Sequence, residues 1–354
     1  MEIADLLPTI LKLLKLRRRL AVATVLSCAG STPVRPGAKA VIGRRGVVAG
    51  TVGGGMAEAE TQRQAVSAIR SGRPAVFEVD LSGVGNQEGS AICGGRMRVL
   101  VDPTAAQFQE VYAQAATTLK RREFGVLLTT LQGGDSPEIS VKWVEARSLD
   151  SHTGFPSADD IRQCYEAPAA RLFAAARSPD AAGEISVFVE PWIPKPQLII
   201  VGGGHIGQAV AAQTHLVGFE TVVIDDRPEF TEEHLFPAGT RTICGPIGET
   251  LSTFQRDPDS YIVIVTRSAQ QDAAALAATF QQPASYVGMI GSRRKIELLR
   301  RTLVGSGAVT EEKFDRVHAP IGLDIGAETV PEIATSIVAQ LIAVRRRRPH
   351  PIGS

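Results

Sequence analysis

Cysteine is scarce in this sequence, which has four in 354 residues. Cys28, Cys93, Cys164 and Cys244 form no CxxC pair and no Cys/His spacing typical of zinc, which argues against a disulfide framework and a structural metal site. Long hydrophobic runs are also missing, because no stretch approaches the roughly 18 apolar residues that span a bilayer. The first apolar stretch is interrupted, and its basic residues follow it, whereas in a signal peptide they precede it. We therefore expect a soluble cytoplasmic protein.

An excess of charge of either sign is absent as well. Lys and Arg number 38 against 37 for Asp and Glu, so the formal net charge is +1. This balance offers no general attraction for nucleic acid or an anionic membrane, and we expect neither as a partner. The sequence also lacks a GxSxG elbow, an HExxH motif and a recognisable pair of catalytic carboxylates. It therefore indicates no complete catalytic set.

Three prolines within six residues mark the expected domain boundary. Pro191, Pro194 and Pro196 cannot continue a helix or lie in a central strand, and a chain of this length is sufficient for two domains. We expect a mixed α/β domain over residues 1–190, with a glycine-rich loop at 82–95 and a weakly patterned stretch at 146–185. Its expected helices cover 2–19, 56–70 and 105–121, and its expected strands cover 20–27, 38–42, 47–52, 75–81, 97–101, 126–131 and 140–145.

Beyond the boundary, residues 191–354 show short apolar strands that alternate with helices. This pattern is typical of a parallel sheet covered on both faces, a doubly wound Rossmann-like fold. The expected strands cover 197–201, 221–225, 241–244, 261–266 and 286–290, and the expected helices cover 205–217, 270–281, 293–305 and 330–346.

A glycine-rich turn follows the first of these strands. A GxGxxG pattern is weak evidence alone, but this one directly follows an apolar strand and opens a helix, as a dinucleotide fingerprint requires. Gly202 suits the tight turn, Gly204 the close approach of a pyrophosphate and Gly207 the packing of helix on strand. The free N–H groups at the helix start would face the phosphates. The residues assigned to this site are Gly202, Gly204, His205, Ile206 and Gly207.

An acidic pair ends the second strand of the same domain. Asp225 stands about 20 positions after the last glycine of the turn, where an acid normally accepts hydrogen bonds from a ribose diol. Asp226 follows it, and Arg227 could instead meet a 2′-phosphate. The alternative is a solvated acidic pair without a ligand.

Later strands end in cationic and polar segments, at the edge of the sheet where ligands of such folds bind. Three cations at a helix start oppose the helix macrodipole, so a bound anion would relieve their placement. Solvated cations, and a purely structural final loop, are the alternatives. The candidate residues are Thr266 and Arg267, then Gly291, Ser292, Arg293, Arg294 and Lys295, and in the final loop Gly322, Asp324, Gly326 and Glu328.

The first domain contains two further candidate binding segments. Thr32 and Lys39 lie in or beside a turn stiffened by prolines, and Gly53, Gly54 and Gly55 offer backbone N–H groups before a helix. Together they could hold a second anionic or heterocyclic group, although each alone is typical of a plain turn. Glycines also follow Cys93, so its thiol could be accessible and its pKa lowered by N–H groups, unless it is a packing residue.

Taken together, these motifs resemble the XdhC/CoxI family, the accessory proteins of xanthine dehydrogenase and related molybdenum hydroxylases. The resemblance covers nearly the whole chain. It implies an N-terminal XdhC/CoxI-type domain followed by a Rossmann domain, in agreement with the boundary at the prolines. The segments that carry it are 30–39, 52–55, 92–95, 202–208, 225–230, 288–295 and 319–329.

The resemblance also implies a function. Such a chaperone binds the molybdenum cofactor, protects it while a cysteine desulfurase installs its terminal sulfido ligand, and delivers it to the hydroxylase; we expect a homodimer. Two departures concern the metal end of that cofactor: many relatives have a cysteine where this chain has Met56, and often a histidine in the stretch that here reads 267–272. Cys93 is then the remaining motif thiol for a molybdenum or sulfur-transfer contact.

Two other functions stay open at this point. An NAD(P)-dependent oxidoreductase would use the glycine turn and Asp225, but the sequence offers no convincing proton donor beside a nicotinamide. A scaffold could dock the hydroxylase and use a nucleotide for stability alone. The fold does not decide among these functions. We favour a non-catalytic maturation chaperone, and the fingerprint leaves NAD(P) as a second candidate cofactor.

Overall fold

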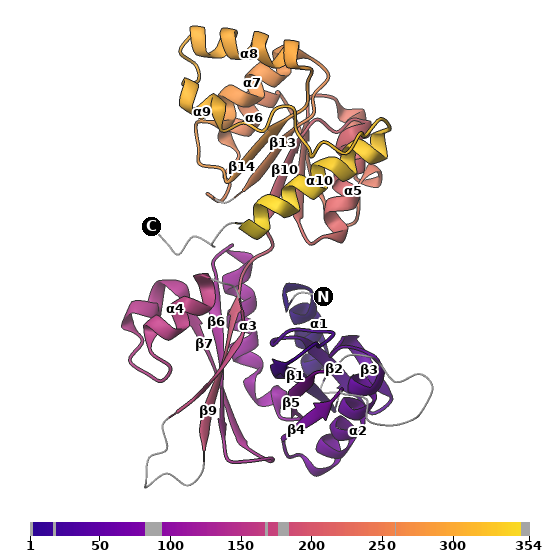
Figure 1. Cartoon of the computed structure of the whole chain (residues 1–354), viewed down its shortest axis with the longest axis vertical. Coiled ribbons are helices and arrows are strands. Elements are labelled where there is room, and N and C mark those ends of the chain that lie inside the picture. Colours follow the sequence, from indigo (N-terminus) through magenta and orange to yellow (C-terminus); the bar gives the residue numbers. More distant parts are fainter. Residues whose placement is uncertain are drawn as a thin grey trace. The chain divides into compact units, whose positions relative to one another are not determined.

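The computed structural model describes residues 3–16, 19–81, 94–166, 169–175, 184–258 and 260–347. They form two compact units, which separate after Pro194 and are coloured along the chain in Figure 1. No helix among these residues is long and apolar enough to cross a membrane.

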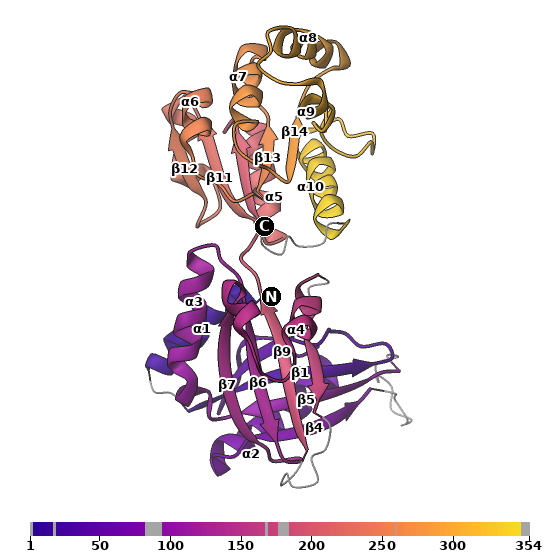
Figure 2. The same ribbon diagram turned by 90° about the vertical axis from the view of Figure 1, so that its left-hand side faces the viewer.

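The N-terminal unit contains two antiparallel sheets, one lying in front of the other in Figure 2. Leu26 and Leu100 of the first sheet pack on Leu131 and Phe188 of the second, so the sheets meet face to face. The first has the order β3-β2-β1-β5-β4, with β1 at Leu20–Ala29, β2 at Lys39–Gly43, β3 at Gly46–Gly50, β4 at Ala75–Asp80 and β5 at Arg96–Asp102. The second has the order β7-β6-β9-β8, with β6 at Gly125–Gln132, β7 at Glu138–Glu145, β8 at Arg171–Ala174 and β9 at Ile185–Trp192.

Helices cover the outer parts of these sheets. Along β1, Ala21 and Ala23 pack in the cluster that contains the buried face of α2, whereas Leu20 and Val22 pack in the cluster that contains α1 and α3. The alternation follows from the two-residue period of a strand, and it explains why β1 is apolar on both faces. The helices are α1 at Ile3–Lys15, α2 at Gly55–Ser71, α3 at Gln109–Lys120 and α4 at Ala158–Glu166, with 3₁₀ turns at Ala105–Phe108 and Ala146–Ser151.

Two expectations about this unit were wrong. Pro191 lies inside β9, which has a neighbour on each side in its sheet. The pairing of β8 with β9 stops at Val189, so at Pro191 only β6 is alongside and the strand is locally an edge, where proline is tolerated. The weakly patterned stretch 146–185 also contains α4 and β8. The apolar stripe of α4 is short, Ile161, Cys164 and Tyr165, and gives little periodic signal.

The C-terminal unit is built on five parallel strands, as the alternating pattern predicted. Their order is β12-β11-β10-β13-β14, so β10 is central and the carboxyl ends of β10 and β13 form the switch point at which ligands bind in such sheets. The α/β fold class, with a Rossmann-like second domain, is therefore confirmed. The strands are β10 at Gln197–Val201, β11 at Glu220–Asp225, β12 at Arg241–Cys244, β13 at Tyr261–Ile264 and β14 at Tyr286–Met289.

The faces of this sheet are covered by different helices. Leu198 and Ile200 pack in the cluster of α5 and α10, whereas Ile199 and Val201 pack in the cluster of α6 to α9. Figure 1 shows α5 and α10 lying side by side. The helices are α5 at His205–Leu216, α6 at Ile247–Thr253, α7 at Ala269–Thr279, α8 at Arg293–Gly305, α9 at Glu311–Asp315 and α10 at Val330–Arg347.

Candidate functional site

The glycine turn between β10 and α5 is shaped mainly by contacts within the protein. Gly202 has φ +113°, which favours glycine, and a Cβ there would lie 2.6 Å from the carbonyl oxygen of Val265. A Cβ at Gly207 would overlap the carbonyl oxygen of Gly202, and one at Gly203 would overlap that of Phe230. These three positions therefore require glycine whether or not a ligand binds.

Gly204 is different. Its φ is −66°, which any residue adopts, and a Cβ there would meet no described atom within 4 Å. It is the N-cap of α5, and no side chain among the described residues caps that helix. Open space thus lies over the free N–H groups of the helix, the arrangement that binds phosphates. His205 is exposed beside it, whereas the side chain of Ile206 packs against the core on the α5 face.

Asp225 faces the turn. Its side chain is 2% exposed, and its carboxylate accepts hydrogen bonds from the backbone N–H of Gly203 (2.8 Å) and of Arg227 (3.0 Å). The Arg227 guanidinium donates two more, at 2.9 and 3.0 Å, and lies over the ring of Phe230. Burial alone would raise the pKa of Asp225, but these hydrogen bonds outweigh it and hold the pKa below its ordinary value. The bond to a ribose diol stays a prediction, and it would require Arg227 to release an oxygen.

Asp226 connects two of the predicted segments. Its Oδ2 accepts a hydrogen bond from Gln271 Nε2 at 2.6 Å and from Arg267 at 3.3 Å. The end of β11 is therefore joined to the start of α7, and the charge of Arg267 is balanced by a protein carboxylate.

A buried acid that the sequence analysis did not single out lies between β13 and β14. Asp272 is fully buried, and its Oδ1 accepts a hydrogen bond from the Thr266 hydroxyl at 2.5 Å. Its other oxygen forms an ion pair with Lys295, whose side chain is 25% exposed. Asp272 stands in the first turn of α7, just after the capping residue Ser268, where a helix start favours an acid; that was the available signal.

The three consecutive cations at the start of α8 thus divide into two kinds. Lys295 turns inward to Asp272, whereas Arg293 and Arg294 are exposed. The hydroxyl of Ser292 caps the helix by accepting a hydrogen bond from the backbone N–H of Lys295. Gly291 precedes the cap, and a Cβ there would press on the Lys295 side chain at 3.2 Å.

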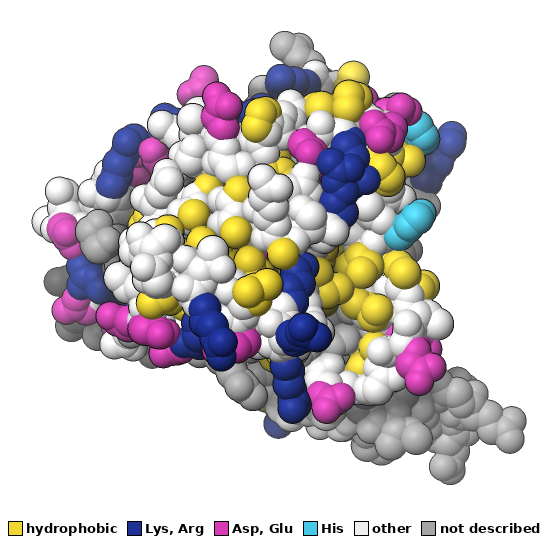
Figure 3. Space-filling view, turned by 90° about the horizontal axis from the view of Figure 1, so that it is seen from above, with side chains coloured by type: hydrophobic (Ala, Val, Ile, Leu, Met, Phe, Trp, Pro, Cys, Tyr) yellow, Lys and Arg dark blue, Asp and Glu magenta, His cyan; other side chains and the backbone are white. Residues whose placement is uncertain are grey.

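The final loop is anchored at its first glycine. Gly322 has φ +101°, a Cβ there would overlap the Ser336 hydroxyl, and its N–H donates to Gln340 at 2.9 Å, so α10 holds it in place. Beyond it Asp324, Gly326 and Glu328 are exposed. Figure 3 views this unit from above and shows apolar side chains beside Lys and Arg on that face. The exposed large apolar residues of the loop are Leu323 and Ile325.

In the N-terminal unit, three segments that are far apart in sequence meet. Gly53, Gly54 and Gly55 have φ of +116°, +71° and +52°, and a Cβ at Gly53 would lie 2.6 Å from Pro33 Cγ. A Cβ at Gly95 would overlap the carbonyl oxygen of Ser31. The triple glycine, the proline turn and the glycines that follow Cys93 are therefore packed together. Thr32 donates its hydroxyl to the carbonyl oxygen of Val34 (2.8 Å), and Met56 is exposed at the start of α2.

Lys39 does not join that surface. Its ammonium is buried between the two sheets, where it donates to Thr24 Oγ1 at 2.7 Å and pairs with Glu190 at 3.0 Å. Cys93 lies outside the described residues. Within the described parts of the chain, no group of three His, Cys, Asp or Glu side chains could hold a metal ion.

Known proteins match both units. The model of the XdhC Rossmann domain matches residues 198–341, and that of the XdhC and CoxI family matches residues 13–80. The chain belongs to the XdhC/CoxI family. A Bacillus subtilis relative, named as one of the probable subunits of xanthine dehydrogenase, is 28% identical over 350 residues, which are 95% of this chain and 96% of that protein. The resemblance in the motifs is thus confirmed.

Two further matches complete the comparison. The uncharacterized protein YqeB of Escherichia coli is 36% identical over 193 residues, which are 52% of this chain but 35% of YqeB, so the match spans about a third of that relative. A crystal structure from Bacillus halodurans, titled a xanthine dehydrogenase, has a TM-score of 0.78 at 24% identity and covers 99% of this chain and 97% of its own. That structure has the same fold.

Proposed function

We propose that this protein is an accessory factor of a xanthine dehydrogenase-type molybdenum hydroxylase. In this proposal it binds the molybdenum cofactor as cargo and assists its sulfuration and insertion. The name of the Bacillus subtilis relative, which matches over nearly its whole length, supports the link to xanthine dehydrogenase. The partners in the proposal are the hydroxylase, a cysteine desulfurase and a second copy of this chain.

The observation that carries the proposal is the space over Gly204. The cargo ends in a phosphate or, as a dinucleotide, in a pyrophosphate, and the uncapped start of α5 presents N–H groups to such an anion. A helix terminus contributes only about 0.3–1 kcal/mol at an exposed site. Hydrogen bonds to charged groups contribute about 1.5–3 kcal/mol each. The exposed Arg293 and Arg294 would therefore supply the larger share of phosphate affinity.

The metal end of the cargo needs soft ligands or a thiol. The bound cargo would supply the molybdenum centre of the hydroxylase, and the role of this chain is to hold and shield it. Met56 has no thiolate, so Cys93 is the candidate for sulfur transfer or a molybdenum contact. Cys93→Ser is expected to weaken retention of the sulfurated cargo, measured as sulfur and molybdenum content after gel filtration. Unchanged content would exclude this role.

Retention of the molybdenum cofactor by the full chain through gel filtration tests the proposal. Gly204→Val is expected to abolish retention without unfolding the protein, because its Cβ meets open space. The matched control is Gly305→Val at the other end of α8, where a Cβ is equally unhindered; it should retain the cargo. Failure of the wild-type protein to retain cofactor, together with tight NAD(P)H binding and substrate-dependent hydride transfer, would favour an oxidoreductase instead.

A further inference from the structure

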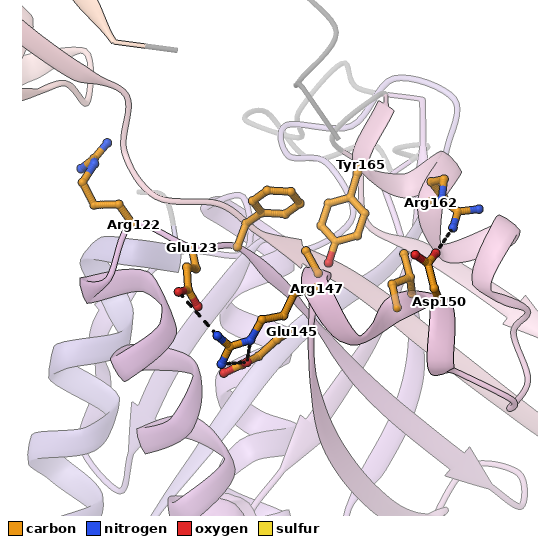
Figure 4. Close-up of a pocket in the computed structure, with 10 residues that line it drawn as sticks. Arg122, Glu123, Glu145, Arg147, Asp150, Arg162 and Tyr165 are labelled. Carbon is orange, nitrogen blue, oxygen red and sulfur yellow. Dashed lines mark hydrogen bonds and ion pairs between the residues drawn. The ribbon is translucent and has the colours of Figure 1, made fainter. Parts of the chain in front are cut away.

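A cavity of about 360 Å³ lies in the N-terminal unit. It is lined by the connection between α3 and β6, by the 3₁₀ turn that follows β7, and by α4, as Figure 4 shows. Sites for small molecules usually measure about 300–1,000 Å³. This cavity therefore has room for a small ligand and not for a dinucleotide. It shares no residue with the proposed cargo site.

Tyr165 contributes an unsatisfied donor to this cavity. The residue is 1% exposed, and its hydroxyl has no hydrogen-bond partner among the described residues. In Figure 4 this hydroxyl points into the group of lining side chains, between Arg147 and Asp150. Burial raises the pKa of Tyr165 above its ordinary value, so the hydroxyl keeps its proton. Buried donors without partners are rare, which indicates that a bound group supplies the acceptor.

The charges at the rim of the cavity are already paired. Arg147 pairs with Glu145 at 2.6 Å, and Arg162 pairs with Asp150 at 2.6 Å. The cavity therefore has no strong preference for an anion or a cation. A guanidinium group that pairs through its edge keeps its flat face available for stacking on a ring.

The remaining wall is apolar and aromatic. Leu149 is buried, and Phe124 meets the ring of Tyr165 edge to face at 5.2 Å between centroids. Flat rings pack well in such surroundings. A ligand that suits all of these features is uncharged and planar, and it carries a hydrogen-bond acceptor.

We propose that this cavity binds a neutral planar heterocycle of one or two rings, the chemical class of the nucleobases. A ring nitrogen or carbonyl oxygen of the ligand accepts the hydrogen bond of the Tyr165 hydroxyl. Its faces lie against Phe124, Leu149 and the flat guanidinium of Arg147. This binding site is independent of the cargo function.

Calorimetric titration of the full chain with two matched rings tests the assignment. Benzimidazole carries a ring acceptor at neutral pH and indole does not, so benzimidazole is expected to bind about five- to tenfold more tightly. Hypoxanthine, a nucleobase, is expected to bind as well. Tyr165→Phe should abolish the preference for benzimidazole while indole binding persists. Its melting temperature should not fall, because the hydroxyl that it removes has no partner in the described structure.

A second variant separates occupancy of the cavity from the hydrogen bond. Ala146 lines the cavity, so Ala146→Leu should weaken binding of both rings at least tenfold. Retention of the molybdenum cofactor should be unchanged in both variants. Absence of binding of all three compounds to the wild-type protein, as expected if only water meets Tyr165, would overturn the proposal, and so would a preference that survives in Tyr165→Phe.

Discussion

The chain has two glycine-rich turns that each open a helix, and they are built for different reasons. At the triple glycine before α2, all three residues have positive φ, so the backbone itself requires glycine. In the turn before α5, Gly202, Gly203 and Gly207 avoid clashes with neighbouring backbone, whereas nothing in the described structure requires glycine at Gly204. The comparison teaches that a glycine motif indicates a ligand only at positions that the fold itself leaves unexplained.

The two lysine–carboxylate pairs differ in a similar way. Lys39 and Glu190 are closed off between two sheets, whereas Lys295 reaches buried Asp272 from the open edge of the parallel sheet. Of the two lysines, only Lys295 is placed where it could also meet a ligand. A cation in a motif therefore does not by itself identify a binding residue.

The largest effect is expected at the closed pair. Lys39→Met leaves Glu190 buried without a counter-ion, which typically costs about 3–5 kcal/mol, and the free energy of unfolding in urea measures it. The double variant Lys39→Met with Glu190→Leu should recover most of the loss, because no charge is then left unpaired. A cost below about 1 kcal/mol for the single variant would mean that Lys39 is not internal.

The next effect concerns the acid behind the phosphate turn. Asp225→Asn weakens the hydrogen bonds to Arg227 and Gly203 and should cost about 2–3 kcal/mol at neutral pH. Because the folded-state pKa of Asp225 is lowered, its contribution is complete above the unfolded value near 4 and is lost as the pH falls through the folded pKa. The two proteins should therefore converge in stability below about pH 4. A difference that does not vary with pH would contradict this assignment.

A pair of neighbouring substitutions sharpens the comparison of glycines. Gly203→Ala pushes a Cβ against the carbonyl oxygen of Phe230 and should cost about 1–3 kcal/mol. Gly204→Ala should change the stability by less than about 0.5 kcal/mol. Thermal unfolding of both variants measures the contrast, and equal losses would show that Gly204 also has a structural role.

The smallest effect is expected where α3 ends. Arg122 has φ +59° just after the helix, and the N–H of Glu123 donates to the carbonyl oxygen of Thr118, whereas α2 ends with a glycine, Gly72, at φ +70°. A glycine is favoured at such a position. Arg122→Gly should therefore stabilise the protein by up to about 1 kcal/mol, and the reverse change, Gly72→Arg, should destabilise it. Denaturant midpoints compare the two, and a loss in Arg122→Gly would show that the contacts of the arginine side chain outweigh the backbone preference.

Local patterns were sufficient for much of the fold. Buried strands such as 197–201 are short apolar runs, and the helix at 293–305 begins with the capping Ser292, so both were predicted with the observed bounds. The segments with little local signal were not. Strand β9 ends in prolines that become tolerable only because β8 stops at Val189, and α4 has too few turns to show a period.

The sequence by itself determined the Rossmann fingerprint, the parallel sheet and the family motifs, because these depend on spacing along the chain and on the period of each element. Only the tertiary structure decided how each charge is used. Asp225 is bound to Arg227, Lys39 to Glu190 and Lys295 to Asp272. Most of these pairings join residues of different strands and helices, and the cost of burying a charge selects them only once packing has removed the water. For the same reason Gly204 stands apart from its neighbouring glycines only in three dimensions.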